Sequence, residues 1–210
     1  GIRDYKVNGV QTCALPIYEL LFIIAQSRHE GGSLEGPVVG TLMSNLGLEH
    51  ALQRKNIEFV RAQVGDRYVM ELLQRHNGVI GGESSGHIIC LDRTTTGDGM
   101  VSALQVLATV VQKRASLHEL KQGMHKYPQL MINVPLEQRI DVDASQPIQA
   151  AVKAAEKVLD GKGRVLLRPS GTEPLIRVMV EGEEEALVHE QAKKIAAVVQ
   201  QTVSAQAESA

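Results

Sequence analysis

The apolar positions between Tyr18 and Leu120 alternate between helical spacing and short strand-like runs, with polar or glycine-containing turns between them. Apolar residues that recur every three or four positions are typical of amphipathic helices, and short runs rich in Val and Ile are typical of strands. This region therefore predicts an α/β architecture. The expected helices are 18–28, 47–55, 66–75, one from Asp98 and one from Ser116, and the expected strands are 37–45, 57–64, 79–83 and 86–92.

Local signals mark the ends of several of these helices. Asp66 is expected to cap the helix 66–75, and Asn77-Gly78 is a typical helix stop. Ser116 and Glu119 have the spacing of a capping box. The long helix from Asp98 carries its apolar side chains at helical spacing: Met100, Ala103, Leu104, Leu107 and Val111.

The pattern pauses around 124–129, and a different order of elements follows. Apolar runs and caps predict strand, helix, strand, strand, helix, with the first helix starting at Pro147 and ending at Asp160-Gly161. We therefore expect a three-layer α/β domain over 18–126 and a smaller α+β domain of β-α-β-β-α order over 127–205. Residues 1–17 have no clear period, and we interpret them as a non-native or disordered leader; 206–210 are expected to form a disordered tail.

Composition narrows the possible functions. The formal net charge is −2, and four Tyr and two Phe are the only aromatic residues, so neither a basic nucleic-acid surface nor a base-stacking platform is expected. Two cysteines form no disulfide framework, which indicates a reducing compartment such as the cytoplasm. The apolar run 20–25 follows Pro16 and Glu19 and is far shorter than the ~20 residues of a membrane span, so we interpret it as a helix start rather than a signal peptide.

The segment 168–174 (RPSGTEP) has the chemistry of a phosphate clamp. Arg168 offers a planar fork of donors, while Ser170 and Thr172 add hydroxyls. Gly171 allows backbone N–H groups to approach an anion closely, and Arg177 follows as a supporting cation. The alternative is a tight turn whose hydroxyls bond only their own backbone.

A second cluster lies in 81–87 (GGESSGH), where Glu83, Ser85 and His87 stand at alternate positions. Alternate side chains of extended backbone point the same way, so the three can converge on one ligand. Glu and Ser suit sugar hydroxyls, and His87 is a candidate phosphate donor or proton shuttle near neutral pH. The alternative is a hairpin corner with a structural acid and a surface histidine.

Together these blocks resemble the α-D-phosphohexomutases, and among them most closely the bacterial phosphoglucosamine mutase family. The resemblance runs from about Glu19 to Val203 and rests on residues 40–52, 64–69, 81–87, 91–107 and 166–183. The family has four domains around a cleft, and this chain is similar to the third and fourth. The resemblance implies that Glu83, Ser85 and His87 bind the sugar, and that Arg168, Ser170, Gly171, Thr172 and Arg177 bind the phosphate that is not reacting.

The resemblance also implies an activity for the full-length enzyme. Family members interconvert 6-phospho and 1-phospho sugars, here glucosamine phosphates, through a phosphoserine in the first domain and a Mg²⁺ site in the second. They pass through a bisphosphorylated intermediate, and the full-length enzyme is expected to be a cytoplasmic homodimer. Residues 65–67 match a further loop near the cleft, although Asp66 also fits a plain helix cap.

This chain departs from the family pattern because it has neither the serine loop nor the aspartate-rich metal loop. No metal site is expected in this chain, and we expect it to be inactive alone, with exposed apolar surface where the remainder would pack. The alternatives are a fragment of a glucose or mannose phosphate mutase, or a non-catalytic module that binds phosphosugars.

Overall fold

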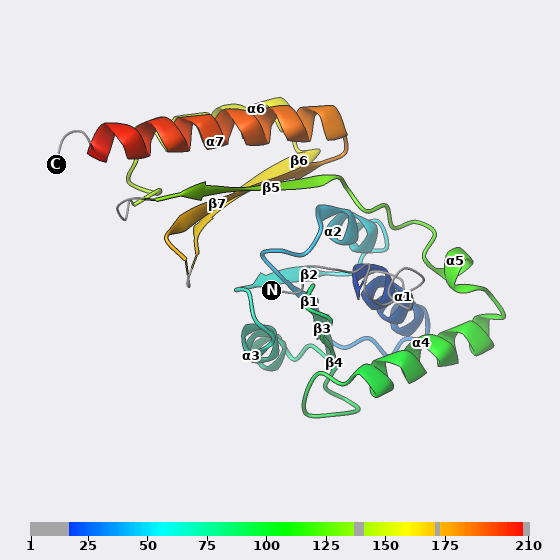
Figure 1. The fold of residues 1–210 in the computed structure, drawn as a ribbon. Helices are drawn as coiled ribbons and strands as arrows, with labels where there is room; N and C mark the ends of the chain where they lie inside the picture. Colours follow the sequence, from blue (N-terminus) through cyan, green and yellow to red (C-terminus); the bar gives the residue numbers. More distant parts are fainter. Residues whose placement is uncertain (1–16, 137–140, 171–172, 208–210) are drawn as a thin grey trace, which may run out of the picture. The chain divides into compact units, whose positions relative to one another are not determined.

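The computed structural model describes residues 17–136, 141–170 and 173–207, and the chain divides into two compact units after His125. Figure 1 shows the order of the elements along the chain. Each unit has its own sheet and its own apolar core. Most of the leader and the last three residues lie outside the described part, as do Gly171 and Thr172.

The first unit contains a four-stranded sheet in the order β2-β1-β3-β4, in which β1 runs parallel to β2 and β3, while β4 is antiparallel to β3. Its helices are α1 (Ile17–Glu30), α2 (Leu46–Gln53), α3 (Asp66–His76), α4 (Gly99–Lys113) and α5 (Leu117–Leu120), and its strands are β1 (Val38–Thr41), β2 (Phe59–Ala62), β3 (Ile80–Gly82) and β4 (Ile88–Cys90). All nine predicted elements of this region are therefore confirmed, with small shifts at their ends.

Helices cover both faces of this sheet, which confirms the three-layer α/β prediction. Val38 packs with buried residues of α1, α2 and α4, whereas its neighbour Val39 packs with Val69 and Leu73 of α3. Successive strand residues point to opposite faces, so these two clusters lie on opposite sides of the sheet.

The N-cap of α3 differs from the sequence prediction, and the structure also shows which way the apolar row of α4 faces, on which the sequence made no prediction. Gly65, not Asp66, is the N-cap of α3; its φ of 131° suits glycine, and Asp66 is the first helical residue, whose Oδ1 accepts from the Arg67 N–H at 2.7 Å. The apolar row of α4 faces outward, because its buried residues are Ser102, Val106 and Thr109. By contrast, the Asp98 cap and the capping box at Ser116 are both present as predicted.

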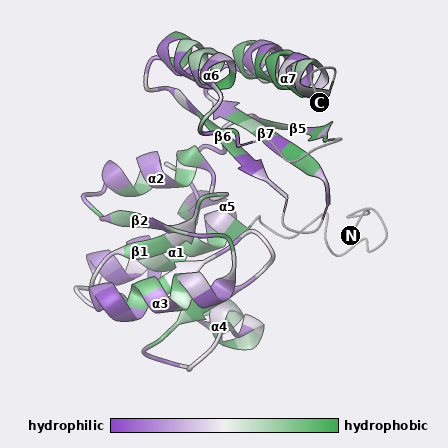
Figure 2. Cartoon of the chain, turned by 90° about the vertical axis from the view of Figure 1, so that its left-hand side faces the viewer, coloured by the Kyte–Doolittle hydropathy of each residue, from purple (hydrophilic) through white to green (hydrophobic). Residues whose placement is uncertain are grey.

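The second unit contains β5 (Gln129–Pro135), α6 (Gln146–Leu159), β6 (Gly163–Pro169), β7 (Leu175–Gly182) and α7 (Glu185–Ala207). The sheet order is β5-β7-β6, fully antiparallel, which confirms the predicted β-α-β-β-α order. Figure 1 and Figure 2 both show α6 and α7 on the same side of this sheet. The core between them includes Ile148, Ile176, Val178, Val188 and Val199. Helix α7 extends to Ala207, two residues into the expected tail.

Candidate functional site

The β3–β4 corner brings together the three side chains that the sequence singled out. The Ser85 hydroxyl donates to Glu83 Oε1 and lies 3.0 Å from His87 Nδ1, which is 3.3 Å from the same Glu83 oxygen. Glu83 is buried, while the His87 side chain is 49% exposed. We call Glu83, Ser85 and His87 the polar corner. It presents an imidazole and a hydroxyl to solvent above a buried carboxylate.

The backbone of the polar corner is held by its own hydrogen bonds. The Glu83 N–H donates to the His87 carbonyl at 3.0 Å, and the Gly86 N–H donates to the Glu83 carbonyl at 3.2 Å. Gly86 has a φ of 110°, a conformation that side chains other than glycine rarely adopt. The tight turn at Gly86 therefore fixes how the three side chains converge.

The polar corner lies at the carboxyl edge of the parallel strands β1, β2 and β3, where open α/β sheets bind ligands. The neighbouring turn after β1 is pinned by Arg61, whose Nη1 donates to the carbonyls of Thr41 at 3.0 Å and Ser44 at 2.7 Å. Arg61 also pairs with Glu49 at 2.6 Å. This edge is therefore rigid beside the corner.

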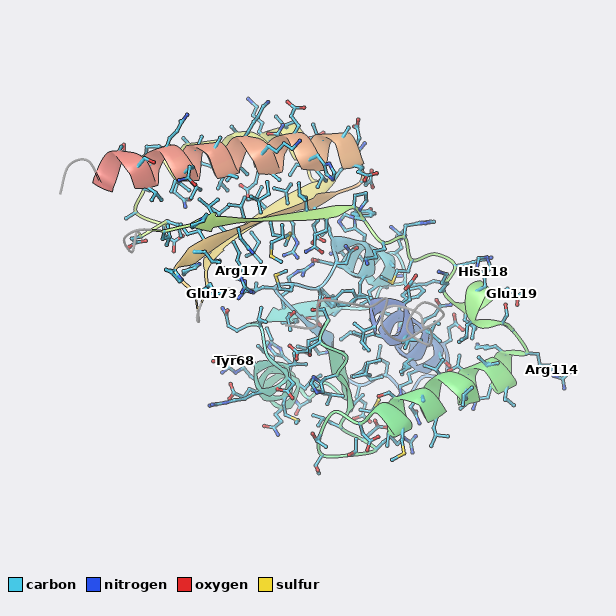
Figure 3. All side chains as sticks on the ribbon, viewed as in Figure 1. Tyr68, Arg114, His118, Glu119, Glu173 and Arg177 are labelled. Atoms are coloured by element: carbon cyan, nitrogen blue, oxygen red, sulfur yellow. The ribbon has the colours of Figure 1, made fainter. Side chains whose placement is uncertain are left out.

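The loop after β2 begins at the same edge, but its predicted residues face outward. Asp66 and Arg67 are exposed, and Arg67 pairs with Glu71 at 2.9 Å and lies 6.0 Å from the centroid of the Tyr68 ring. Figure 3 shows Tyr68 projecting from α3. The contacts of Asp66 and Arg67 among the described residues are thus those of a helix start, and none joins them to the polar corner.

In the second unit, Arg168 on β6 and Arg177 on β7 are register partners across the antiparallel ladder. Asn133 on β5 is the partner of Arg177 on its other side, so one rung carries Asn133, Arg177 and Arg168 in that order. Side chains of directly paired residues share a face of the sheet. We call these three residues the arginine rung; they lie on the face opposite the core residues Ile176 and Val178.

The two arginines are half-buried, and their like charges lie side by side on paired strands. The Nε atoms of both are buried, and neither has a hydrogen-bond partner among the residues that the structure describes. Burial, and then the positive charge of Arg177, lower the pKa of Arg168 below its ordinary value. Directly opposed like charges destabilise a sheet, so a negative charge placed between the two arginines would stabilise the rung.

The loop beside the rung contributes polar atoms. Arg177 Nη2 lies 3.4 Å from Ser170 Oγ and 3.5 Å from Glu173 Oε2, and the Glu173 N–H donates to Ser170 Oγ at 3.3 Å. Figure 3 shows Glu173 and Arg177 next to each other near the start of β7. The predicted phosphate-binding residues Gly171 and Thr172 lie between these atoms in sequence, outside the described residues.

Sequence reasoning missed two members of this region. Asn133 belongs to the rung only through the β5–β7 register. The sequence could have indicated its side of the sheet, because its neighbours Ile132 and Val134 are apolar and face the core. Glu173 stands inside the predicted loop but received no role. Arg177 was predicted as a supporting residue, and the register places it directly across from Arg168.

The described residues contain no group of three or more His, Cys, Asp or Glu side chains arranged to hold a metal ion. Asp141 and Asp143 stand close together in sequence, but Asp141 accepts from the backbone N–H groups of Asp143 and Ala144 at 3.0 and 3.2 Å, as in an ordinary turn. Among the helices of the described part, none has both the length and the apolar character that a membrane span requires.

Comparisons with known proteins agree with this architecture. The family model of phosphoglucomutase/phosphomannomutase α/β/α domain III matches residues 17–127, and the model of the C-terminal domain of the same family matches 131–198. The phosphoglucosamine mutase of Methylococcus capsulatus is 62% identical over 188 residues, which are 89% of this chain and 42% of that protein. The phosphoglucosamine mutase of Alkalilimnicola ehrlichii is 57% identical, over 87% of this chain and 40% of that protein.

Solved structures support the fold. A structure of N-acetylphosphoglucosamine mutase from Aspergillus fumigatus superposes with a TM-score of 0.73 at 18% identity, over 89% of this chain and 43% of that one. A phosphoglucomutase/phosphomannomutase family protein from Burkholderia thailandensis gives 0.68 at 15% identity, over 91% and 43%. The chain spans well under half the length of these relatives. It belongs to the phosphoglucomutase/phosphomannomutase family and carries the family's domain III and C-terminal domain.

Proposed function

We propose that this chain is the sugar- and phosphate-binding half of a phosphoglucosamine mutase, which interconverts glucosamine 6-phosphate and glucosamine 1-phosphate. The observation that carries the proposal is the arginine rung. Arg168 and Arg177 face each other with buried, unpartnered Nε atoms among the described residues. A phosphate accepting from Nε and Nη of each fork would satisfy both donors and remove the repulsion between the two charges.

The polar corner is the proposed sugar site. The Glu83 carboxylate is the acceptor that a sugar hydroxyl or the ammonium of an amino sugar would use, and Ser85 already donates to it. His87 is half exposed and can exchange a proton with a bound hydroxyl or phosphate through Nε2, because Nδ1 is the ring nitrogen that lies against Ser85 and Glu83. The preference for the amino sugar is supported by the names of the relatives and by this carboxylate.

An anchored distal phosphate serves the chemistry of a mutase. The bisphosphorylated intermediate must present each of its two ends in turn to one phosphoryl donor. A clamp that recognises a phosphate, rather than a particular carbon of the sugar, accepts either end. Holding the sugar by two loops then orients the free end for transfer, which lowers the entropic barrier of the reaction.

The phosphoserine and Mg²⁺ of the proposed reaction belong to other parts of the full-length enzyme. The acidic residues described in this chain do not form a metal-ligand group, so no step assigned to them runs through the metal. The residues of this chain bind and orient the substrate and hold or move a proton at His87. For the full-length protein we propose a homodimer in the cytoplasm.

A residue-resolved NMR titration of the chain with glucosamine 1-phosphate, and with glucose 1-phosphate for comparison, tests the proposal. We expect shifts at Arg168, Ser170 and Arg177 with both ligands and stronger binding of the amino sugar. Arg168→Gln should abolish the shifts, whereas Lys157→Gln, which removes one exposed positive charge from α6, should leave them intact. If millimolar ligand shifts no residue of the rung, the phosphate site is refuted; equal binding of both sugars refutes the amino-sugar preference alone.

A further inference from the structure

One side of α4 exposes a continuous row of large apolar side chains. Met100 is 77% exposed, Leu104 61%, Leu107 56% and Val111 75%. Their spacing of four, three and four residues places them on one face of the helix. We call these four residues the α4 stripe. Soluble proteins seldom expose apolar rows of this extent unless another surface covers them.

The orientation of α4 is fixed, so the stripe cannot turn inward. On the buried side, the Ser102 hydroxyl donates to the Asp98 carbonyl at 2.6 Å and lies 3.3 Å from the Ile88 carbonyl. Gln105 accepts from Arg28 of α1 at 3.0 Å, and Arg28 in turn pairs with Asp92 at 2.7 Å. These contacts anchor the helix to α1 and β4 with the stripe pointing outward.

The chemistry of this face differs from that of a solvated helix. Helix α4 has no charged residue before Lys113. Between Met100 and Val111, the remaining exposed positions are Ala103 and Ala108. The exposed side of α3, in contrast, carries Arg67 and Glu71. Small residues between large apolar ones allow another backbone to approach closely, so the stripe fits an uncharged apolar protein surface.

We propose that the α4 stripe is the docking surface for the part of the full-length protein that precedes domain III. The domain III model begins to match at residue 17, the first residue of α1, and α1 packs against α4. A preceding domain is joined to this unit by the chain itself at the start of α1, so its local concentration around the unit, the stripe included, is high. The relatives are long enough to contain such a preceding domain, because this sequence spans only 40–42% of their length. This inference rests on family membership and is independent of the proposed substrate.

Oxidation of Met100 by hydrogen peroxide, followed by peptide mass spectrometry, measures whether the stripe is covered. The 210-residue chain is compared with a full-length chimera in which the preceding part of the Methylococcus capsulatus relative is joined at residue 17. We expect Met100 to react readily in the chain and about tenfold more slowly in the chimera, since oxidation follows exposure. Met124, which is buried in the first unit, is the internal control for folding and should stay protected in both.

A charge placed in the stripe tests whether Met100 is protected by a surface that docks on the stripe itself. Leu104→Glu should leave the thermal stability of the chain unchanged, yet restore rapid Met100 oxidation in the chimera. Val158→Glu, at a 49% exposed apolar position of α6, is the matched control, and Met100 should stay protected in the chimera that carries it. Equal oxidation of Met100 in chain and chimera overturns the proposal. Protection that appears in the chain alone and rises with its concentration also overturns it, because a second copy would then cover the stripe.

Discussion

The polar corner and the arginine rung are built in opposite ways. In the corner, Glu83, Ser85 and His87 already contact one another through hydrogen bonds, and a tight turn at Gly86 holds their backbone. In the rung, Arg168 and Arg177 face each other with unsatisfied buried donors. The corner is therefore preorganised without ligand, whereas the rung is completed by one. We expect ligand to stabilise the second unit far more than the first.

The largest effect should come from removing a guanidinium fork. Arg177→Lys keeps the charge but loses the planar pair of donors, and hydrogen bonds to charged groups contribute about 1.5–3 kcal/mol. We therefore expect phosphate affinity, measured by calorimetry with glucosamine 1-phosphate, to fall by about tenfold or more. Lys157→Arg on α6 is the reciprocal control and should bind normally. Unchanged affinity of Arg177→Lys would mean that Arg177 acts only as a diffuse charge.

How far the sequence could predict these two sites follows from their construction. The convergence of Glu83, Ser85 and His87 is local, since alternation over five residues is enough to predict it. The opposition of Arg168 and Arg177 depends on the register of a hairpin, and Asn133 joins them only through a third strand more than 30 residues away. The sequence identified the row on α4 as apolar. It could not show that the row faces outward, because spacing defines a face and not what covers it.

The next largest effect is expected from a carboxylate placed in the rung. Asn133→Asp sets a negative charge directly across from Arg177, so it should stabilise the empty chain and compete with phosphate. We expect a few degrees of thermal stabilisation and about a tenfold loss of affinity, equivalent to ~1.4 kcal/mol. Gln200→Glu, at an exposed position of α7, makes the same change in net charge and should change neither the thermal stability nor the phosphate affinity. If Asn133→Asp lowers the thermal stability instead of raising it, a negative charge does not stabilise the rung.

A smaller effect is expected at the polar corner, because its members support one another. Glu83→Gln keeps the shape but removes the carboxylate that Ser85 and His87 share. We expect the affinity ratio of glucosamine 1-phosphate to glucose 1-phosphate to fall by about fivefold, or ~1 kcal/mol, with binding of inorganic phosphate unaffected. Loss of inorganic phosphate binding as well would show that Glu83 maintains the fold and does not select the sugar.

The smallest effect on ligand binding should follow from a change in backbone alone. Gly86→Ala meets no atom within 4 Å, but it forces a side chain to adopt a φ of 110°. Strain of this kind costs about 1–3 kcal/mol, so the first unit should lose stability in chemical denaturation. Gly99→Ala is the matched control, since it also meets no atom within 4 Å, lacks a positive φ and stands at the start of α4.

Sugar discrimination by Gly86→Ala should weaken about twofold, because the same donors remain but are aimed less accurately. A stable Gly86→Ala variant with full discrimination would show that the corner is not held by its turn, and that the bonds among Glu83, Ser85 and His87 suffice to organise it.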